Sequence, residues 1–153
     1  MNMKPIKVFI DSSVIIAGLA STKGGSREIL NLAELRFLVP VISEQVVREV
    51  TRNVERKLPD YLSHYYQLFR LLPFIMIEPD QESLERAREL INPQDAGILA
   101  SALSVRANWL ISLDKHFLAL KNEELAIKIG SPRDFLEDVE LVTREHTEGT
   151  KSL

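Results

Sequence analysis

The chain has 153 residues, of which 45% are hydrophobic and 27% are charged, as is typical of a single globular domain. Its formal net charge of −3 argues against a protein that binds polyanions with its whole surface, so any contact with nucleic acid must be local. The absence of cysteine excludes disulfides, thiolate zinc sites and cysteine nucleophiles, and it fits a reducing compartment such as the cytoplasm.

Short runs rich in β-branched and aromatic residues alternate along the chain with helical segments. We expect five buried strands, at residues 7–10, 37–42, 74–77, 109–112 and 125–129. We expect helices at residues 12–20, 27–35, 44–57, 60–72, 81–90, from 93 onward, and 133–137. The longest apolar run, VIIAGLA, is far shorter than the roughly 20 residues of a membrane span, so we expect a cytoplasmic protein without a membrane anchor.

The ends of the expected helices carry recognisable signals. Ser43, Asp80 and Asn92 are candidate N-caps, and Pro93 occupies the first helical position that proline tolerates. Strands that alternate with helices predict an α/β fold with a mostly parallel sheet and helices on both faces. We assign one domain to residues 1–138 and a polar, flexible C-terminal tail to residues 139–153.

Four acidic residues stand at positions where a ligand site is expected. Asp11 directly follows the first strand, and Asp114 follows the fourth, so both reach one crevice if these strands lie side by side. Asp95 lies in the first turn of the helix that begins after Asn92. Glu49 lies in the middle of its helix, where it borders the buried stripe.

Three of the four acids also have an ordinary structural explanation. Asp95 can stabilise the helix dipole, and Asp114 can cap the short turn that follows it. Glu49 can pair with Arg48 or Arg52 on the surface of its own helix. These alternatives stay open for each residue taken alone.

Asp11 has no comparable structural explanation, because Ser12 and Ser13 follow it where an ordinary turn would use glycine or proline. Four carboxylates in one crevice of low dielectric would repel one another. A hard divalent cation with oxygen ligands, such as Mg²⁺, removes that conflict. The three histidines, at positions 64, 116 and 146, are scattered and form no zinc set, although His116 is close enough to Asp114 to touch a substrate.

Five segments of this chain resemble the PIN domain family, named for the N-terminus of PilT. They are VFIDSSVIIAGL, SEQVVREV, NPQDAGILASAL, WLISLDKHF and IGSPRDFL. The resemblance runs from about residue 7 to residue 137, and the order and spacing of the segments are far more specific than any one of them alone. The resemblance implies three α/β/α layers around a parallel five-stranded sheet of order 3-2-1-4-5.

The resemblance also implies an active site around one or two Mg²⁺ or Mn²⁺ ions. The acids carried over from the family are Asp11, Glu49, Asp95 and Asp114. The hydroxyl residues that would line the site are Ser12, Ser13 and Ser112. The family often has threonine where this chain has Ser112, and Thr-Asn or Thr-Ser where it has Ser12-Ser13. Ser112 keeps the hydroxyl, and neither departure argues against activity.

PIN domains are typically ribonucleases that act on single-stranded RNA, and many small ones are toxins of VapC-type toxin–antitoxin pairs. The resemblance thus implies an endoribonuclease in which Asp11, Asp95 and Asp114 hold the metal. Glu49 would orient or deprotonate the attacking water, or help to hold a second ion. The alternative is a catalytically quiet PIN-fold protein that binds nucleic acid or serves as a scaffold.

Two other enzyme classes do not match the sequence. A haloacid-dehalogenase-like phosphatase needs a second aspartate two residues after the first, where this chain has Ser13. A P-loop or dinucleotide enzyme needs a glycine-rich fingerprint, and STKGGS (21–26) fits neither pattern.

Two helices carry candidate contact surfaces. Arg48, Arg52 and Arg56 recur every four residues on the helix of Glu49, so they form one stripe. The stripe is either a solvated face or a contact for RNA phosphates, for which Arg48 and Arg52 are the better placed. The aromatic residues of the helix at 60–72 pack in the core or, because the apolar arc is wide, form part of a homodimer or antitoxin interface.

Overall fold

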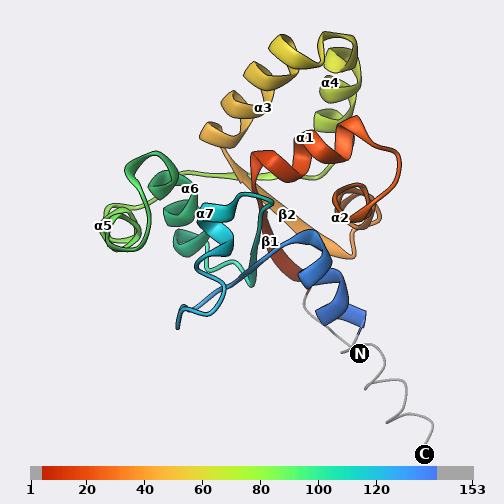
Figure 1. Ribbon diagram of the computed structural model, residues 1–153. Helices are drawn as coiled ribbons and strands as arrows, with labels where there is room; N and C mark the ends of the chain where they lie inside the picture. The colour runs from red at the N-terminus through yellow and green to blue at the C-terminus, as the bar shows by residue number, and fades with distance from the viewer. Residues whose placement is uncertain (1–4, 141–153) are drawn as a thin grey trace, which may run out of the picture.

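The computed structural model describes residues 5–140, which form three layers, with a five-stranded sheet between two layers of helices (Figure 1). All neighbouring strands are parallel, and their order is β3-β2-β1-β4-β5. The strands are β1 (Ile6–Ile10), β2 (Leu38–Ser43), β3 (Ile75–Ile77), β4 (Trp109–Ile111) and β5 (Lys128–Gly130). The predicted parallel sheet and its predicted order are both confirmed.

The helices connect the strands. They are α1 (Ser12–Ala20), α2 (Gly25–Glu34), α3 (Glu44–Lys57), η1 (Pro59–Tyr61), α4 (Leu62–Leu71), α5 (Gln81–Leu90), α6 (Pro93–Ser104), α7 (Lys115–Leu118) and a last helix at residues 132–140. Helices α1 and α2 lie on one side of the sheet, and α5 and α6 lie on the other (Figure 1). Within residues 5–140, no helix combines the length and the apolar character that crossing a bilayer requires.

The core is centred on β1. Residues 8–10 of this strand are fully buried, because β1 has a strand on each side and a layer of helices on each face. Helix α3 adds three fully buried valines at intervals of four residues: Val46, Val50 and Val54. The edge strand β3 differs, since Ile75 and Met76 are 44% and 48% exposed.

The three expected N-caps are confirmed. The side chains of Ser43, Asp80 and Asn92 each accept a hydrogen bond, of 2.7–3.4 Å, from the backbone N–H three residues further on. Such bonds satisfy amides that the first turn of a helix leaves without partners. The caps therefore fix where α3, α5 and α6 begin.

Some boundaries differ from those expected. The strand expected at 125–129 forms only at Lys128–Gly130, because its partner β4 offers just three residues for pairing. The helix expected at 60–72 is divided into η1 and α4. The last helix, expected at 133–137, spans 132–140 and so includes the first two residues of the expected tail; residues 141–153 lie outside the described residues.

Candidate active site

The strand order reverses between β1 and β4, and this reversal brings two distant segments of the chain together. The backbone N–H of Asp11, just beyond β1, donates to the carbonyl of Ile111 at the end of β4 (3.0 Å). The Ser112 hydroxyl then donates to Asp11 Oδ2 (2.7 Å), and the Ser13 hydroxyl donates to the same oxygen (2.8 Å). The carboxylate of Asp11 is thus held at the carboxyl edge of the sheet, where ligands bind in folds of this kind.

Asp11 is buried without a cationic partner. Its exposed fraction is 3%, and within residues 5–140 no lysine or arginine forms an ion pair with Asp11, Glu49, Asp95 or Asp114. Burial raises the pKa of the Asp11 carboxyl and the nearby Glu49 carboxylate raises it further, while the serine hydrogen bonds act in the opposite direction. A buried carboxylate whose partners are all uncharged is costly to fold, and a bound cation would remove that cost.

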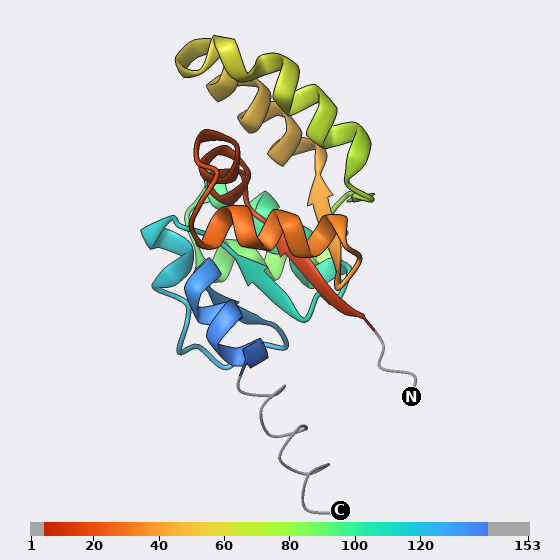
Figure 2. The same cartoon turned by 90° about the vertical axis from the view of Figure 1, so that its right-hand side faces the viewer.

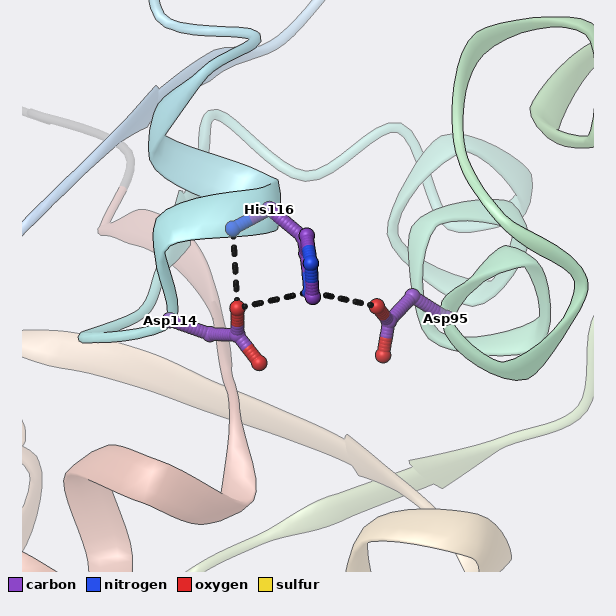
Figure 3. A group of neighbouring side chains, drawn as sticks. All are labelled: Asp95, Asp114 and His116. Atoms are coloured by element: carbon purple, nitrogen blue, oxygen red, sulfur yellow. Dashed lines mark hydrogen bonds and ion pairs between the residues drawn. The ribbon is translucent and has the colours of Figure 1, made fainter.

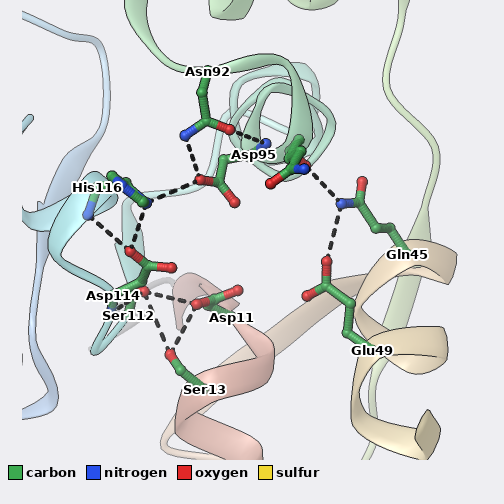
Figure 4. A network of polar contacts seen from close by, with 10 residues as sticks. Asp11, Ser13, Gln45, Glu49, Asn92, Asp95, Ser112, Asp114 and His116 are labelled. Atoms are coloured by element: carbon green, nitrogen blue, oxygen red, sulfur yellow. Dashed lines mark hydrogen bonds and ion pairs between the residues drawn. The ribbon is translucent and has the colours of Figure 1, made fainter. Parts of the chain in front are cut away.

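Asp95 and Asp114 face each other across His116 (Figure 3). The imidazole Nδ1 of His116 lies 3.2 Å from Asp114 Oδ1 and 3.5 Å from Asp95 Oδ2. Asp114 Oδ1 also accepts the backbone N–H of His116 (2.8 Å), so Asp114 caps α7, as one of the two explanations for this residue predicted. Its second carboxylate oxygen points toward the space enclosed by the other acids (Figure 4).

Asp95 is not the cap of its helix. Asn92 is the N-cap of α6, and its side-chain Nδ2 in turn donates to Asp95 Oδ2 (2.7 Å). The Asp95 carboxylate accepts none of the α6 backbone hydrogen bonds described here, and it points toward Asp114 and His116 instead (Figure 4). Asn92 therefore both begins the helix and orients the acid.

Glu49 forms the opposite wall of the site. Its Oε2 accepts the Ser12 hydroxyl (2.7 Å), and its Oε1 accepts Gln45 Nε2 (3.1 Å). The surface pairing considered for Glu49 is not seen in residues 5–140, where Arg48 pairs with Glu44 at 3.6 Å. Glu49 thus turns inward from the border of the buried stripe of α3.

The polar groups lie in a ring around one space, and their contacts run along two sides of it (Figure 4). On one side, Ser112 links Asp11 to Asp114: its Oγ accepts the backbone N–H of Asp114 (2.9 Å), and its hydroxyl donates to Asp11. On the other side, Gln45 Nε2 donates both to Glu49 and to the backbone carbonyl of Gln94 (3.0 Å), next to Asp95. The structure therefore brings all four predicted acids and all three predicted serines together around this space.

Within the ring, the tightest set of ligand atoms differs from the expected one. Asp95, Asp114 and His116 each offer one atom within 4.8 Å of the other two. Asp11 stands outside this set and is linked to it through Ser112. Gln45 and Asn92 were not predicted as part of the site, and His116, considered only as a contact for substrate, lies between two of the acids. Gln45 had a usable signal, because it precedes Glu49 by four residues on the same helix face.

A profile of the PIN domain family matches residues 7–116, which is more than half of the chain. The chain belongs to the PIN domain family. No curated protein sequence matches it significantly. The match covers the elements that carry all four acids of the site.

Solved structures share this PIN fold at low sequence identity. The DNA-bound VapBC of Salmonella typhimurium aligns with 20% identity and a TM-score of 0.61, over 83% of this chain and 98% of that chain. VapBC2 of Rickettsia felis, bound to a promoter DNA fragment, aligns with 14% identity and a TM-score of 0.59, over 81% and 97%. PAE2754 of Pyrobaculum aerophilum aligns with 14% identity and a TM-score of 0.60, over 89% and 97%. At these identities the structural similarity establishes the fold.

Proposed function

We propose that this PIN domain is a metal-dependent endoribonuclease that hydrolyses phosphodiester bonds of single-stranded RNA. The observation that carries the proposal is the ring of four carboxylates around one space, with no lysine or arginine ion pair to them in residues 5–140. Such an arrangement is stable only with protons or cations, and carboxylate oxygens are the ligands that Mg²⁺ and Mn²⁺ prefer. The donor set therefore fits the divalent cation that the family implies.

In this proposal Asp95 and Asp114 are the main ligands of the cation, and Asp11 completes the site directly or through water. A divalent cation supplies Lewis acidity, which offsets the charge of a phosphodiester and acidifies water. Ser112 and Ser13 hold Asp11, and Asn92 holds Asp95, so the ligands are oriented before a cation arrives.

Glu49 is the proposed proton acceptor for the attacking water. Ser12 and Gln45 each donate to one of its carboxylate oxygens, so both oxygens are fixed in direction. A carboxylate held this way can orient a water and accept its proton without reorganisation of the site.

Arg48 and Arg52 are the proposed contacts for RNA phosphates. Both are exposed on α3, the helix that carries Glu49. The pair that Arg48 makes with Glu44 is 63% and 62% exposed, and exposed pairs contribute only about 0–1 kcal/mol, so a phosphate can displace it. Replacing both arginines by glutamine should reduce the slope of RNA affinity against salt concentration. An unchanged slope would show that the two arginines face solvent and do not contact phosphates.

We further propose that the protein is the toxin of a toxin–antitoxin pair. The support is the PIN family membership and the shared fold with chains from two VapBC structures, nearly the full length of which it covers. A cytoplasmic location stays a prediction. Co-expression with the product of the neighbouring reading frame tests the pairing: the partner should relieve growth arrest and co-purify with the protein, and a partner that does neither contradicts it.

The ribonuclease proposal is tested by cleavage of single-stranded RNA with purified protein in Mg²⁺, Mn²⁺ or EDTA. We expect cleavage only with a cation, and a loss of at least about a hundredfold in Asp11→Asn and Asp95→Asn, which keep the shape of the side chain but remove its charge. Circular dichroism should show that both variants fold. Cation binding without cleavage of any RNA would favour the catalytically quiet alternative.

A further inference from the structure

We propose that His116 is a metal ligand through Nδ1, and that its imidazole gives the site a preference for first-row transition metals over Mg²⁺. This inference deepens the proposed function, because it names the class of metal that the same site selects. It rests on the proposed cation site, and it does not depend on which RNA is cut.

The position of Nδ1 is the first support. It lies 3.2 Å from Asp114 Oδ1 and 3.5 Å from Asp95 Oδ2. Ligand atoms around an ion at bond lengths of about 2.1 Å are separated by about 3.0 Å in an octahedral site and about 3.4 Å in a tetrahedral one. Both distances from Nδ1 are therefore those of neighbouring ligands of one ion, and one ligand atom from each of the three residues lies within 4.8 Å of the other two.

The hydrogen-bonding capacity of imidazole is the second support. A neutral imidazole has at most one hydrogen on Nδ1, and this hydrogen can serve only one acceptor well. Here Nδ1 faces two carboxylate oxygens at once, one from α6 and one from the turn before α7 (Figure 3). A cation among the three atoms satisfies both carboxylates and the lone pair of the nitrogen together.

The local fold fixes the direction of His116. Its backbone N–H donates a hydrogen bond to Asp114 Oδ1, and the neighbouring residue Phe117 is buried, with 1% of its surface exposed. The turn is thus anchored on one side by the acid and on the other by the core. The imidazole itself is 53% exposed, so its removal leaves no cavity in the core.

The chemistry of the donor set gives the expected selectivity. Mg²⁺ is bound by oxygen and retains its waters, whereas imidazole binds later first-row ions well, with affinities that rise from Mn²⁺ to Co²⁺. Two carboxylates and one imidazole should therefore bind Co²⁺ and Mn²⁺ more tightly than Mg²⁺. Without the imidazole, the site should lose most of this difference.

Pulsed electron paramagnetic resonance of the Mn²⁺-loaded full chain tests the ligand directly. We expect coupling of the ion to ¹⁴N in the wild type and in His64→Ala, a control in which an exposed histidine of α4 is removed. The coupling should disappear in His116→Ala. Titration calorimetry should show a loss of about tenfold or more in Co²⁺ affinity for His116→Ala and little change for Mg²⁺.

The outcomes separate this inference from the ribonuclease proposal. Nitrogen coupling that depends on His116 supports the inference even if no RNA is cut, which would refute only the proposed function. Mn²⁺ bound without nitrogen coupling, or with coupling that survives in His116→Ala, overturns the inference even if RNA is cleaved. A wild-type protein that binds neither Mn²⁺ nor Co²⁺ overturns the inference, and one that also fails to bind Mg²⁺ overturns both.

Discussion

At the scale of single residues, Ser112 links Asp11, which follows β1, to Asp114, which follows β4. It is fully buried, its hydrogen goes to Asp11, and its oxygen accepts the backbone N–H of Asp114. A hydroxyl has one hydrogen to donate, so the direction of both bonds is fixed. The distance between Asp11 and Asp114 is therefore set by one small side chain between the two central strands.

The burial of Asp11 has a measurable consequence for stability. Because the pKa of this carboxyl is raised in the fold above its ordinary value of 3.8, the protonated acid favours folding and the ionised acid opposes it. The favourable contribution is complete below pH 3.8 and is lost as the pH rises through the folded-state pKa. At neutral pH the burial of this carboxyl should therefore lower the stability of the metal-free protein.

We expect Asp11→Asn to unfold with a higher free energy than the wild type at pH 7 in EDTA, by an amount on the order of 1 kcal/mol. The difference should shrink toward zero as the pH falls below 3.8, where the wild-type acid is protonated. Thermal unfolding across this pH range is the measurement. A variant that is less stable than the wild type at pH 7 in EDTA would show that the ionised acid is well satisfied without a cation.

At the scale of elements, α3 illustrates which parts of the site are readable from sequence. The valines at positions 46, 50 and 54 predict its buried face, and that face sets Glu49 at its border. The contact from Gln45 to the carbonyl of Gln94 was not predictable, since it depends on how α3 approaches α6. Periodicity gives the rotation of a helix about its own axis, and packing partners follow only from the assembled fold.

The same limit explains the wrong bounds of the last strand and the place of His116, which the sequence does not indicate. LAIKI is an apolar run, but apolar character indicates burial rather than pairing, and β5 pairs only where β4 runs beside it. The order of strands came from the family resemblance. The positions of the histidines in the sequence do not predict that His116 lies beside Asp95, because only the sheet brings the two segments together.

Gly97 provides a test of how α3 and α6 meet. A Cβ at this position would lie 2.6 Å from Gln45 Oε1, so Gly97→Ala should displace the end of the Gln45 side chain. We expect RNA cleavage to fall by about tenfold, because Glu49 loses one of its two donors, while alanine leaves the helix intact or strengthens it.

Gln45→Ala is the matched control, measured by the rate of RNA cleavage. It should lower the rate by a similar factor, and the double variant should lower it no further, since both changes remove the same contact. Additive losses in the double variant would mean that Gly97 acts through another part of the site.

At the scale of the whole molecule, α3 and α4 form a hairpin that projects from the sheet (Figure 2). Its inner side is core, where Tyr65 is buried and its hydroxyl lies 3.2 Å from Thr51 Oγ1. Large apolar residues are exposed along η1 and α4 and on the neighbouring edge strand, namely Tyr61, Tyr66, Leu71, Ile75 and Met76. Core packing of the aromatic helix is confirmed for Tyr65, and the interface stays a prediction.

This exposed face suits a second copy of the chain. Asp60 and Arg70 lie near opposite ends of the η1–α4 segment, with Tyr66 between them. A twofold axis near the middle of α4 would place Asp60 of each copy by Arg70 of the other, and such self-complementary contacts are typical of homodimers. We therefore predict a homodimer that buries this face.

Sedimentation velocity at micromolar concentration tests the dimer. Leu71→Glu should shift the protein to monomer, because it places a charge within the apolar face. Leu35→Glu is the matched control, since Leu35 and Leu71 are 65% and 66% exposed and Leu35 lies at the end of α2, away from α4. A wild-type monomer, or equal effects of the two changes, would contradict the interface.

At every scale, the proposed function depends on one cation held among acids from separate elements of the fold. Anomalous diffraction from crystals soaked in Mn²⁺ locates such an ion without reference to activity. We predict a single strong peak, or a close pair, within bonding distance of Asp95 and Asp114 and inside the ring completed by Asp11 and Glu49. Manganese that binds only elsewhere on the molecule, with this space occupied by water alone, would contradict the account.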